Sequence, residues 1–137
     1  MNKIQIFTDG SSLGNPGPGG FAAIMRFNGR EKIVKGGEPV TTNNRMEMRA
    51  LIEAFKKIKD KTVPVEVYSD STLLVSTMTK GWKRKKNQDL WADLDKLAEG
   101  LKIEWHWVRG HAGHPENTRA DRIAVAEATK QQINYQH

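Results

Sequence analysis

The sequence predicts an α/β fold in which helices flank a mixed β-sheet. Segments that alternate polar and apolar residues recur between segments with helical spacing, in the order strand, hairpin, helix, strand, helices, strand, helix. Strands that follow helices require crossover connections, which lay helices against a sheet. A length of 137 residues suits one domain with its own core, so we expect residues 1–137 to form a single domain.

The first half of the chain contains three strand patterns and one helix pattern. The spacing predicts a strand over 3–9, a Gly- and Pro-rich loop over 10–20, strands over 21–27 and 31–35 joined by an Asn28-Gly29 turn, and a helix over 46–59 after the helix-start residues 41–44. The helix has an apolar stripe of Met48, Leu51, Ile52, Phe55 and Ile58.

The second half of the chain alternates strands and helices. It predicts a strand over 63–69, a short helix over 72–78, a helix over 89–99 closed by Gly100, a strand over 103–108, a helix from Pro115 through Ala128, and a frayed polar tail over 131–137.

Composition restricts the partners of the protein. Twenty-two Lys and Arg against sixteen Asp and Glu give a net charge of +6, which suits a polyanion such as nucleic acid but equally a merely basic soluble surface. The absence of cysteine excludes disulfides and thiolate zinc sites. No apolar run is long enough for a membrane helix, and the N-terminus enters a strand pattern directly, so we expect a cytoplasmic protein.

The positive charge is concentrated between Lys80 and Lys86. Five cations surround one tryptophan there, and an aromatic ring among cations suits a phosphate backbone better than simple solvation does. The candidate contact residues are Trp82, Lys83, Arg84, Lys85 and Lys86.

Two acidic residues end strand patterns. Asp9 and Asp70 would meet at the carboxyl edge of the sheet if their strands are parallel neighbours, and open α/β sheets place their sites at that edge. The alternative for each is a helix cap or a turn residue.

Two further acidic residues lie on predicted helices. Glu47 borders the apolar stripe of its helix, where a carboxylate is partly desolvated; its alternative role is a capping box with Asn44 as the cap. Asp121 is one turn into the last helix, and its alternative is a surface ion pair with Arg119 or Arg122.

Four converging carboxylates without cysteine suit Mg²⁺ or Mn²⁺ better than zinc. Without a cation they would repel and raise each other's pKa, whereas two bound divalent ions are a recurrent device for phosphoryl transfer. His111, in the loop before the last helix, titrates near neutrality and is a candidate proton carrier, unless it is a structural loop histidine. For His114 we expect a structural capping role.

Five motifs in this order resemble type 1 ribonucleases H, and the resemblance covers residues 3 to 130. The motifs are Phe7 to Ser11, Gly14 to Gly20, Thr42 to Glu47, Ser69 to Ser71, and Val108 to Asn117 with Asp121.

This resemblance implies a ribonuclease H-like fold with a five-stranded mixed sheet, and endonucleolytic cleavage of the RNA strand in RNA/DNA hybrids. It implies two Mg²⁺ ions, with Mn²⁺ as a substitute, 5′-phosphate and 3′-hydroxyl products, and a monomer that acts on the hybrid. The metal ligands would be Asp9, Glu47, Asp70 and Asp121, with His111 assisting proton transfer or product release. The residues that would contact the hybrid are Gly10, Ser11, Ser12, Asn15, Thr42, Asn43, Asn44 and Arg45.

The chain departs from the family pattern in three ways. Its basic stretch, 80–87, is shorter than the basic protrusion of some members. We also expect no separate N-terminal hybrid-binding domain. Ser12 and Thr72 replace a Cys and a Gln of well-known bacterial relatives. The competing functions are a DNA strand-transfer enzyme, which usually carries additional DNA-binding domains, and a non-catalytic hybrid-binding module, which we would expect to have lost a carboxylate.

Overall fold

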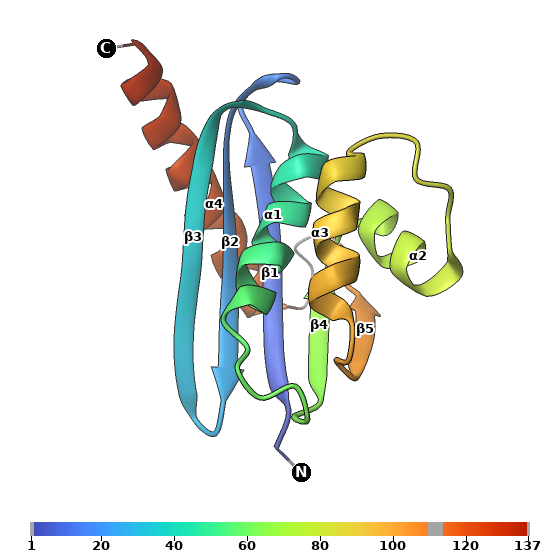
Figure 1. The fold of residues 1–137 in the computed structure, drawn as a ribbon. Coiled ribbons are helices and arrows are strands. Elements are labelled where there is room, and N and C mark those ends of the chain that lie inside the picture. Colours follow the sequence, from blue (N-terminus) through green and yellow to red (C-terminus); the bar gives the residue numbers. More distant parts are fainter. Residues whose placement is uncertain (1, 110–113, 137) are drawn as a thin grey trace.

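The computed structural model describes residues 2–109 and 114–136. Its elements, in chain order, are β1 (Ile4–Ser12), β2 (Gly17–Phe27), β3 (Arg30–Thr41), α1 (Asn43–Lys56), β4 (Val65–Ser69), α2 (Thr72–Lys80), α3 (Gln88–Ala98), β5 (Ile103–Trp107) and α4 (Pro115–Gln136). One five-stranded mixed sheet has α1 and α3 on one face and α4 on the other (Figure 1). The predicted fold class is therefore confirmed.

The sheet order β3-β2-β1-β4-β5 joins an antiparallel part to a parallel part. Strands β1, β2 and β3 form an antiparallel meander, while β4 and β5 run parallel to β1. The chain therefore leaves β1 towards one side of the sheet and returns to pair with it on the other side. The crevice beyond the carboxyl ends of parallel strands at such a point is where α/β sheets place their sites.

The loop predicted over residues 10–20 is confirmed only for residues 13–16. Strand β1 continues through Ser12 and β2 begins at Gly17, because the two strands stay paired to Ser12 opposite Gly19. The glycines here permit close packing of helices on the strands: a Cβ on Gly10 would lie 2.4 Å from the backbone nitrogen of Glu47, and one on Gly20 would lie 2.2 Å from the carbonyl oxygen of Ala124. Glycine in this stretch therefore marks close approach instead of a turn.

Several predicted boundaries also need correction. The strand predicted over 31–35 extends to Thr41, because it pairs with β2 along nearly its whole length. Helix α1 begins at Asn43 and ends at Lys56, earlier than predicted at both ends, since Thr42 caps it. Helix α4 continues to Gln136, so the expected frayed tail over 131–137 was wrong for its described part. The remaining elements differ from prediction by one or two residues at an end.

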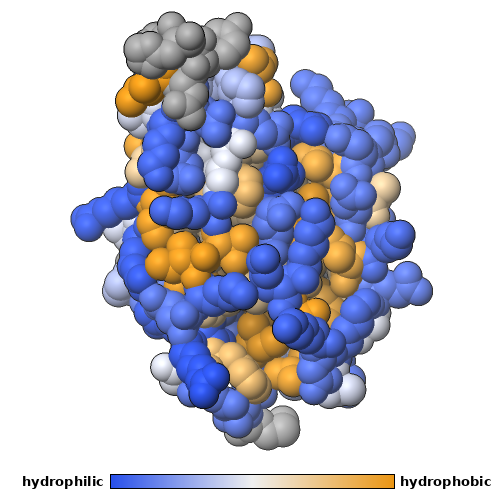
Figure 2. Space-filling view, turned by 60° about the vertical axis from the view of Figure 1, so that its left-hand side comes forward, coloured by the Kyte–Doolittle hydropathy of each residue, from blue (hydrophilic) through white to orange (hydrophobic). Residues whose placement is uncertain are grey.

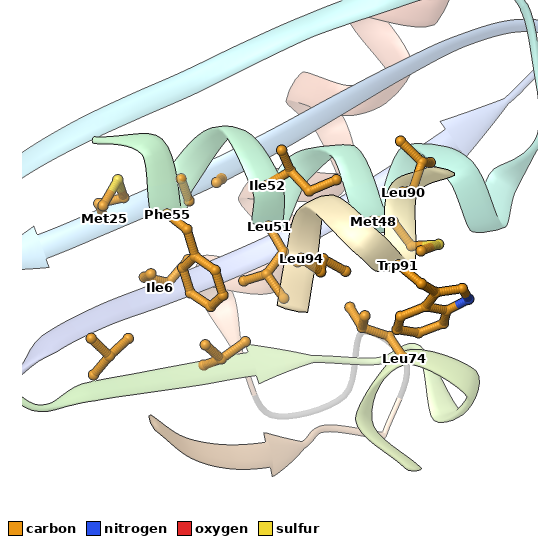
Figure 3. Close-up of a cluster of buried hydrophobic side chains, with 14 residues drawn as sticks. Ile6, Met25, Met48, Leu51, Ile52, Phe55, Leu74, Leu90, Trp91 and Leu94 are labelled. Carbon is orange, nitrogen blue, oxygen red and sulfur yellow. The ribbon is translucent and has the colours of Figure 1, made fainter. Parts of the chain in front are cut away.

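The main core lies between the sheet and the helices α1 and α3. Figure 3 shows Leu51, Phe55 and Leu94 pointing from these helices towards β1 and β4, where Ile6 meets them. Each such side chain contributes about 1.5–3 kcal/mol to the free energy of folding by leaving water. The predicted stripe of α1 is thus its buried face, apart from Ile58, which follows the helix and is partly buried.

A second, smaller core lies under α4. Phe7, Ala22 and Ile24 pack there against Ala120 and Ala124. Because the helix contributes alanines, its backbone approaches the sheet closely, which fixes the start of α4 against β1 and β2.

The face of the molecule in Figure 2 is mostly hydrophilic, with smaller hydrophobic patches between the hydrophilic side chains. Large exposed hydrophobic side chains among the described residues include Ile33 and Val40 on β3, Val125 and Ile133 on α4, Trp82 and Trp107. No helix in the described part of the chain is long and apolar enough to cross a membrane.

Candidate active site

Asp9 and Asp70 lie at the same edge of the sheet. Strands β1 and β4 are parallel neighbours whose pairing ends at Phe7 opposite Tyr68. Asp9 follows two residues later within β1, and Asp70 directly follows β4. The expected convergence of two strand ends on one edge is therefore observed, with Asp9 buried and Asp70 half-buried.

Glu47 joins this pair from α1. Because Gly10 has no side chain, the backbone of α1 packs directly on β1 beside Asp9. Asp9, Glu47 and Asp70 each offer an oxygen atom, and these three atoms lie within 4.8 Å of one another. Since the helix cap is Thr42, whose hydroxyl accepts from the backbone N–H of Arg45 at 3.2 Å, the capping-box role with Asn44 does not apply.

Burial and mutual repulsion disfavour the charged forms of these acids. Burial, followed by the charge of Asp70, raises the pKa of Asp9 to about 7, although a hydrogen bond with Glu47 and one from the backbone of Gly10 oppose the rise. Burial first, and then the charges of Asp9 and Asp70, hold the pKa of Glu47 well above its usual range. The Oε2 atom of Glu47 is buried without a hydrogen-bond partner among the described residues. This acidic cluster (Asp9, Glu47, Asp70) is therefore strained in the absence of a cation.

Asp121 faces the same hollow from α4. A cavity of about 460 Å³ is lined by all four predicted carboxylates. Asp121 lies outside the tight group of three, yet its side chain reaches Asp9 and raises the pKa of that residue. The alternative of an ion pair with Arg119 does not apply, because Arg119 binds Glu31 through two contacts of 2.6 and 2.8 Å.

The donor set of this cavity fits a divalent metal ion. It offers carboxylate oxygens, which are the ligands that hard cations prefer. A cation there would remove the repulsion within the acidic cluster and give the buried Oε2 atom of Glu47 a partner.

Several predicted substrate contacts line the same cavity. Its walls include Gly10, Ser11, Ser12, Asn43 and Asn44. Asn15 is exposed in the turn between β1 and β2. The structure thus brings the end of β1 and the start of α1 together around the carboxylates.

The predicted phosphate contacts Thr42 and Arg45 are engaged within the protein. The Thr42 hydroxyl caps α1. The guanidinium of Arg45 donates to both carboxylate oxygens of Asp89, at 2.8 and 3.1 Å, and to Asn87 at 3.2 Å. These contacts tie the start of α1 to the start of α3.

The basic stretch lies beside the acidic cavity. A second hollow of about 230 Å³ is lined by residues 83–87 together with Asn44 and Leu73, which also line the first cavity. The two hollows therefore adjoin. Arg84 is partly occupied within the protein, since it stacks on Trp91 at 5.0 Å and pairs with Asp95. Trp82 is exposed and does not line this hollow.

His111 lies outside the described residues, so its place relative to the carboxylates stays a prediction. The carbonyl of His114 accepts the backbone N–H of Thr118 at 3.1 Å, at the start of α4. This contact agrees with the capping role expected for His114.

Sequence reasoning missed two side chains that hold the strand ends in place. Trp107 on β5 donates its indole N–H to the carbonyl of Asp70 at 3.2 Å. Asn117 donates to carbonyl oxygens of both β1 and β4. Neither contact could be read from the sequence, because each joins segments at least 37 residues apart.

Comparison with known proteins identifies close relatives. The RNase H family profile matches residues 1–129. A ribonuclease H from Bradyrhizobium sp. (strain ORS 278) is 52% identical over 134 residues, covering 88% of this chain and 86% of that protein. One from Chelativorans sp. (strain BNC1) is 50% identical over 139 residues, covering 92% of this chain and 85% of that protein.

Solved structures agree with the sequence relatives. The N-terminal RNase H domain of a Mycobacterium tuberculosis protein superimposes with a TM-score of 0.85 at 30% identity, covering 98% of this chain and 99% of that one. LC11-RNase H1, solved in complex with an RNA/DNA hybrid, superimposes with a TM-score of 0.79 at 28% identity, covering 93% and 98%.

Proposed function

The chain belongs to the ribonuclease H family, and from that premise we propose that its acidic cavity hydrolyses the RNA strand of RNA/DNA hybrids. The products would be 5′-phosphate and 3′-hydroxyl ends made within the strand. The observation that carries the proposal is the acidic cluster: three carboxylates with oxygens within 4.8 Å of one another, two of them buried. We further propose that residues 1–137 act as a single catalytic domain, as a cytoplasmic monomer.

The four carboxylates would hold two Mg²⁺ ions, with Mn²⁺ as a substitute. Such ions, when bound, supply a water nucleophile at neutral pH and neutralise charge on the leaving oxygen. Asp9 and Glu47 form the buried floor of the site, whereas Asp70 and Asp121 are half-buried at its walls. This arrangement leaves the open side of the cavity for the scissile phosphate.

Residues around the cavity would select and orient the hybrid. Ser11, Ser12, Asn43 and Asn44 present hydroxyl and amide groups beside the carboxylates, suited to a wide minor groove that displays 2′-hydroxyls. Gly10 allows close backbone approach, and Asn15 stands exposed on the adjoining turn. The 2′-hydroxyl would thereby distinguish the RNA strand from the DNA strand.

The basic hollow would hold the phosphate backbone of the hybrid away from the reaction centre. Lys83, Lys85 and Lys86 are exposed around it, with Trp82 beside them. We assign Arg84 and Arg45 a smaller share of phosphate binding than their charge suggests, because both guanidinium groups already bind carboxylates of α3. Thr42 would support hybrid binding indirectly, because its side chain caps the start of α1.

His111 would move a proton or escort the product at the rim of the cavity. This role rests on its match to the family motif and on the neutral titration range of imidazole. Replacement by alanine is expected to lower turnover while leaving metal binding intact, which steady-state kinetics and calorimetry measure separately.

Labelled RNA/DNA hybrid, double-stranded RNA and double-stranded DNA, incubated side by side with and without Mg²⁺, test the proposal. We expect cleavage of the RNA strand of the hybrid alone, and only with the metal. Equal cleavage of double-stranded DNA, or unchanged cleavage of the hybrid in excess EDTA, would refute the assignment.

A further inference from the structure

Asn117 bridges the two strands that carry the acidic cluster at the place where their pairing ends. The β1–β4 ladder stops at Phe7 opposite Tyr68, although β1 stays paired with β2 and β4 with β5 beyond that point. From the first turn of α4, the Nδ2 atom of Asn117 lies 3.3 Å from the carbonyl oxygen of Thr8 and 3.1 Å from that of Tyr68. A side-chain amide thus continues the connection between the strands after their own ladder has stopped.

Burying the Asn117 amide costs free energy, which indicates that the hydrogen bonds it donates have a function. Asn117 is 3% exposed, and its Oδ1 atom is buried without a hydrogen-bond partner among the described residues. An unsatisfied buried acceptor costs about 1–3 kcal/mol. The opposite orientation of the amide would set Oδ1 against two carbonyl oxygens, so the chemistry fixes which atom faces the strands. Asn117 is therefore buried for the two hydrogen bonds that it donates to the carbonyl oxygens of Thr8 and Tyr68.

The bridged carbonyls lie next to the catalytic carboxylates in the chain. Thr8 directly precedes Asp9, and Tyr68 comes two residues before Asp70. A clamp on these carbonyls limits how far the two strand ends can separate, and so limits the distance between the two carboxylates.

The same helix also carries the fourth carboxylate. Asp121 follows Asn117 by four residues, which places both on one face of α4. Anchoring the first turn of α4 to β1 and β4 therefore fixes the position of Asp121 relative to Asp9 and Asp70. One amide couples three of the four carboxylates, which come from three different elements.

We propose that Asn117 is a positioning residue: its amide clamps β1, β4 and α4 together and sets the spacing of the carboxylates for metal binding. The inference rests on the proposed function for its activity measurement, but its metal-binding measurement is independent of the substrate.

Three variants separate this role from general stabilisation. Asn117→Ala removes the clamp, and Asn117→Asp keeps the shape but offers no hydrogen to the carbonyls when ionised. Ala128→Gly, a buried position three turns further along α4, weakens the same helix without touching β1 or β4 carbonyls beside the acids. All three are compared with the wild type by Mg²⁺ titration calorimetry without substrate, by melting temperature, and by kcat and KM on the hybrid.

We expect Asn117→Ala to bind Mg²⁺ about 10-fold or more weakly, as removal of groups that orient metal ligands does. Its kcat at a fixed Mg²⁺ concentration should fall, while KM for the hybrid stays near the wild-type value. Asn117→Asp should lose at least as much Mg²⁺ affinity, and Ala128→Gly should retain it. If Asn117→Ala does not fold, Asn117→Ser, which keeps one donor, is expected to lie between wild type and the aspartate variant.

The clamp is refuted if Asn117→Ala binds Mg²⁺ like the wild type, or if Ala128→Gly at equal melting temperature loses as much affinity. A wild-type protein that binds Mg²⁺ but cleaves no hybrid would instead overturn the proposed function, and calorimetry would still decide on the clamp.

Discussion

Two groups of titratable side chains lie on or beside the parallel strands, and they differ in how their charges are neutralised. The acidic cluster lies at the carboxyl edge of the sheet, beneath α1. The second group, Glu66, Glu104 and His106, lies on neighbouring positions of β4 and β5, also with ligand atoms within 4.8 Å of one another. Proximity alone therefore does not distinguish the two groups.

Neighbouring side chains form ion pairs and hydrogen bonds with the second group. Lys3 binds Glu104 at 3.3 Å, and His106 lies 3.2 Å from Glu66. The hydroxyl of Tyr68 donates to Glu66 at 3.3 Å. The bond from Lys3 lowers the pKa of Glu104, and that carboxylate is exposed.

The acidic cluster shows the opposite behaviour. Its two buried acids have raised pKa values, and one buried oxygen has no partner in the described chain. Burial without an internal cation is thus the feature that favours the acidic cluster over the second group as the metal site, and acidic residues in contact are not sufficient evidence.

The largest expected contrast between the groups is in activity. Asp70→Asn should lower hybrid cleavage by roughly 10²-fold or more, because it removes a charge that stabilises the reaction centre. Glu104→Gln should leave the rate unchanged. Cleavage assays in Mg²⁺, with hybrid binding measured in Ca²⁺, check both. Binding by Asp70→Asn should persist; loss of activity in Glu104→Gln with normal folding would remove the distinction.

The next contrast concerns the cations beside each group. Lys83→Ala, Lys85→Ala and Lys86→Ala together should weaken hybrid binding and flatten its salt dependence, by about 0.7–0.9 in the log–log slope per lost phosphate contact. Lys3→Met removes the cation of the second group and should leave that slope unaltered. Binding titrations between low and moderate salt concentrations measure this slope for each variant. An unaltered slope in the triple variant would make the basic hollow a solvated surface.

A smaller contrast is expected in the pH dependence of stability without metal. Because the pKa of Asp9 is raised from 3.8 to about 7 on folding, its protonation stabilises the folded protein fully below about pH 4, and this contribution is lost as pH rises through 7. Asp9→Asn should therefore stabilise the metal-free protein at pH 8, by about 1–4 kcal/mol and hence several degrees in melting temperature.

Glu104 provides the control of opposite sign. Its pKa is lowered on folding, so Glu104 stabilises the folded protein above its unfolded pKa, and this contribution is lost as pH falls through its folded pKa. Glu104→Gln should slightly lower the melting temperature at pH 8, or leave it unchanged. Thermal melts in EDTA at pH 5 and pH 8 compare the two variants. A stabilised Glu104→Gln together with a destabilised Asp9→Asn at pH 8 would contradict the claim that the acidic cluster, and not the second group, is strained without metal.

How much the sequence predicted depended on whether a feature was local. Asp9 and Asp70 could be found because each follows a strand pattern, and Glu47 because it borders a helical stripe. Residues 10–12 and 17–20 were assigned to a loop because the stretch is rich in glycine and proline, whereas Gly10 and Gly20 lie in strands and permit contact with helices that the sequence does not position.

The remaining features depend on alignment between distant segments. The group of Glu66, Glu104 and His106 exists only because β4 and β5 pair in the observed register. The Asn117 clamp requires α4 to reach strands about 50 and 110 residues earlier. No periodicity within a single segment encodes such a register, so these contacts needed the structure.

Calorimetric titration of the metal-free protein with Mg²⁺ at pH 7, in two buffers of different ionisation enthalpy, tests most directly whether the acidic cluster is the metal site. Since the pKa of Asp9 is about 7, Mg²⁺ binding should release a fraction of a proton from Asp9. That release should decrease in Asp9→Asn, where Glu47 still has a raised pKa, and stay unchanged in Glu104→Gln. Mg²⁺ binding with undiminished proton release in Asp9→Asn, together with loss of binding in Glu104→Gln, would place the metal at the second group and contradict the assignment.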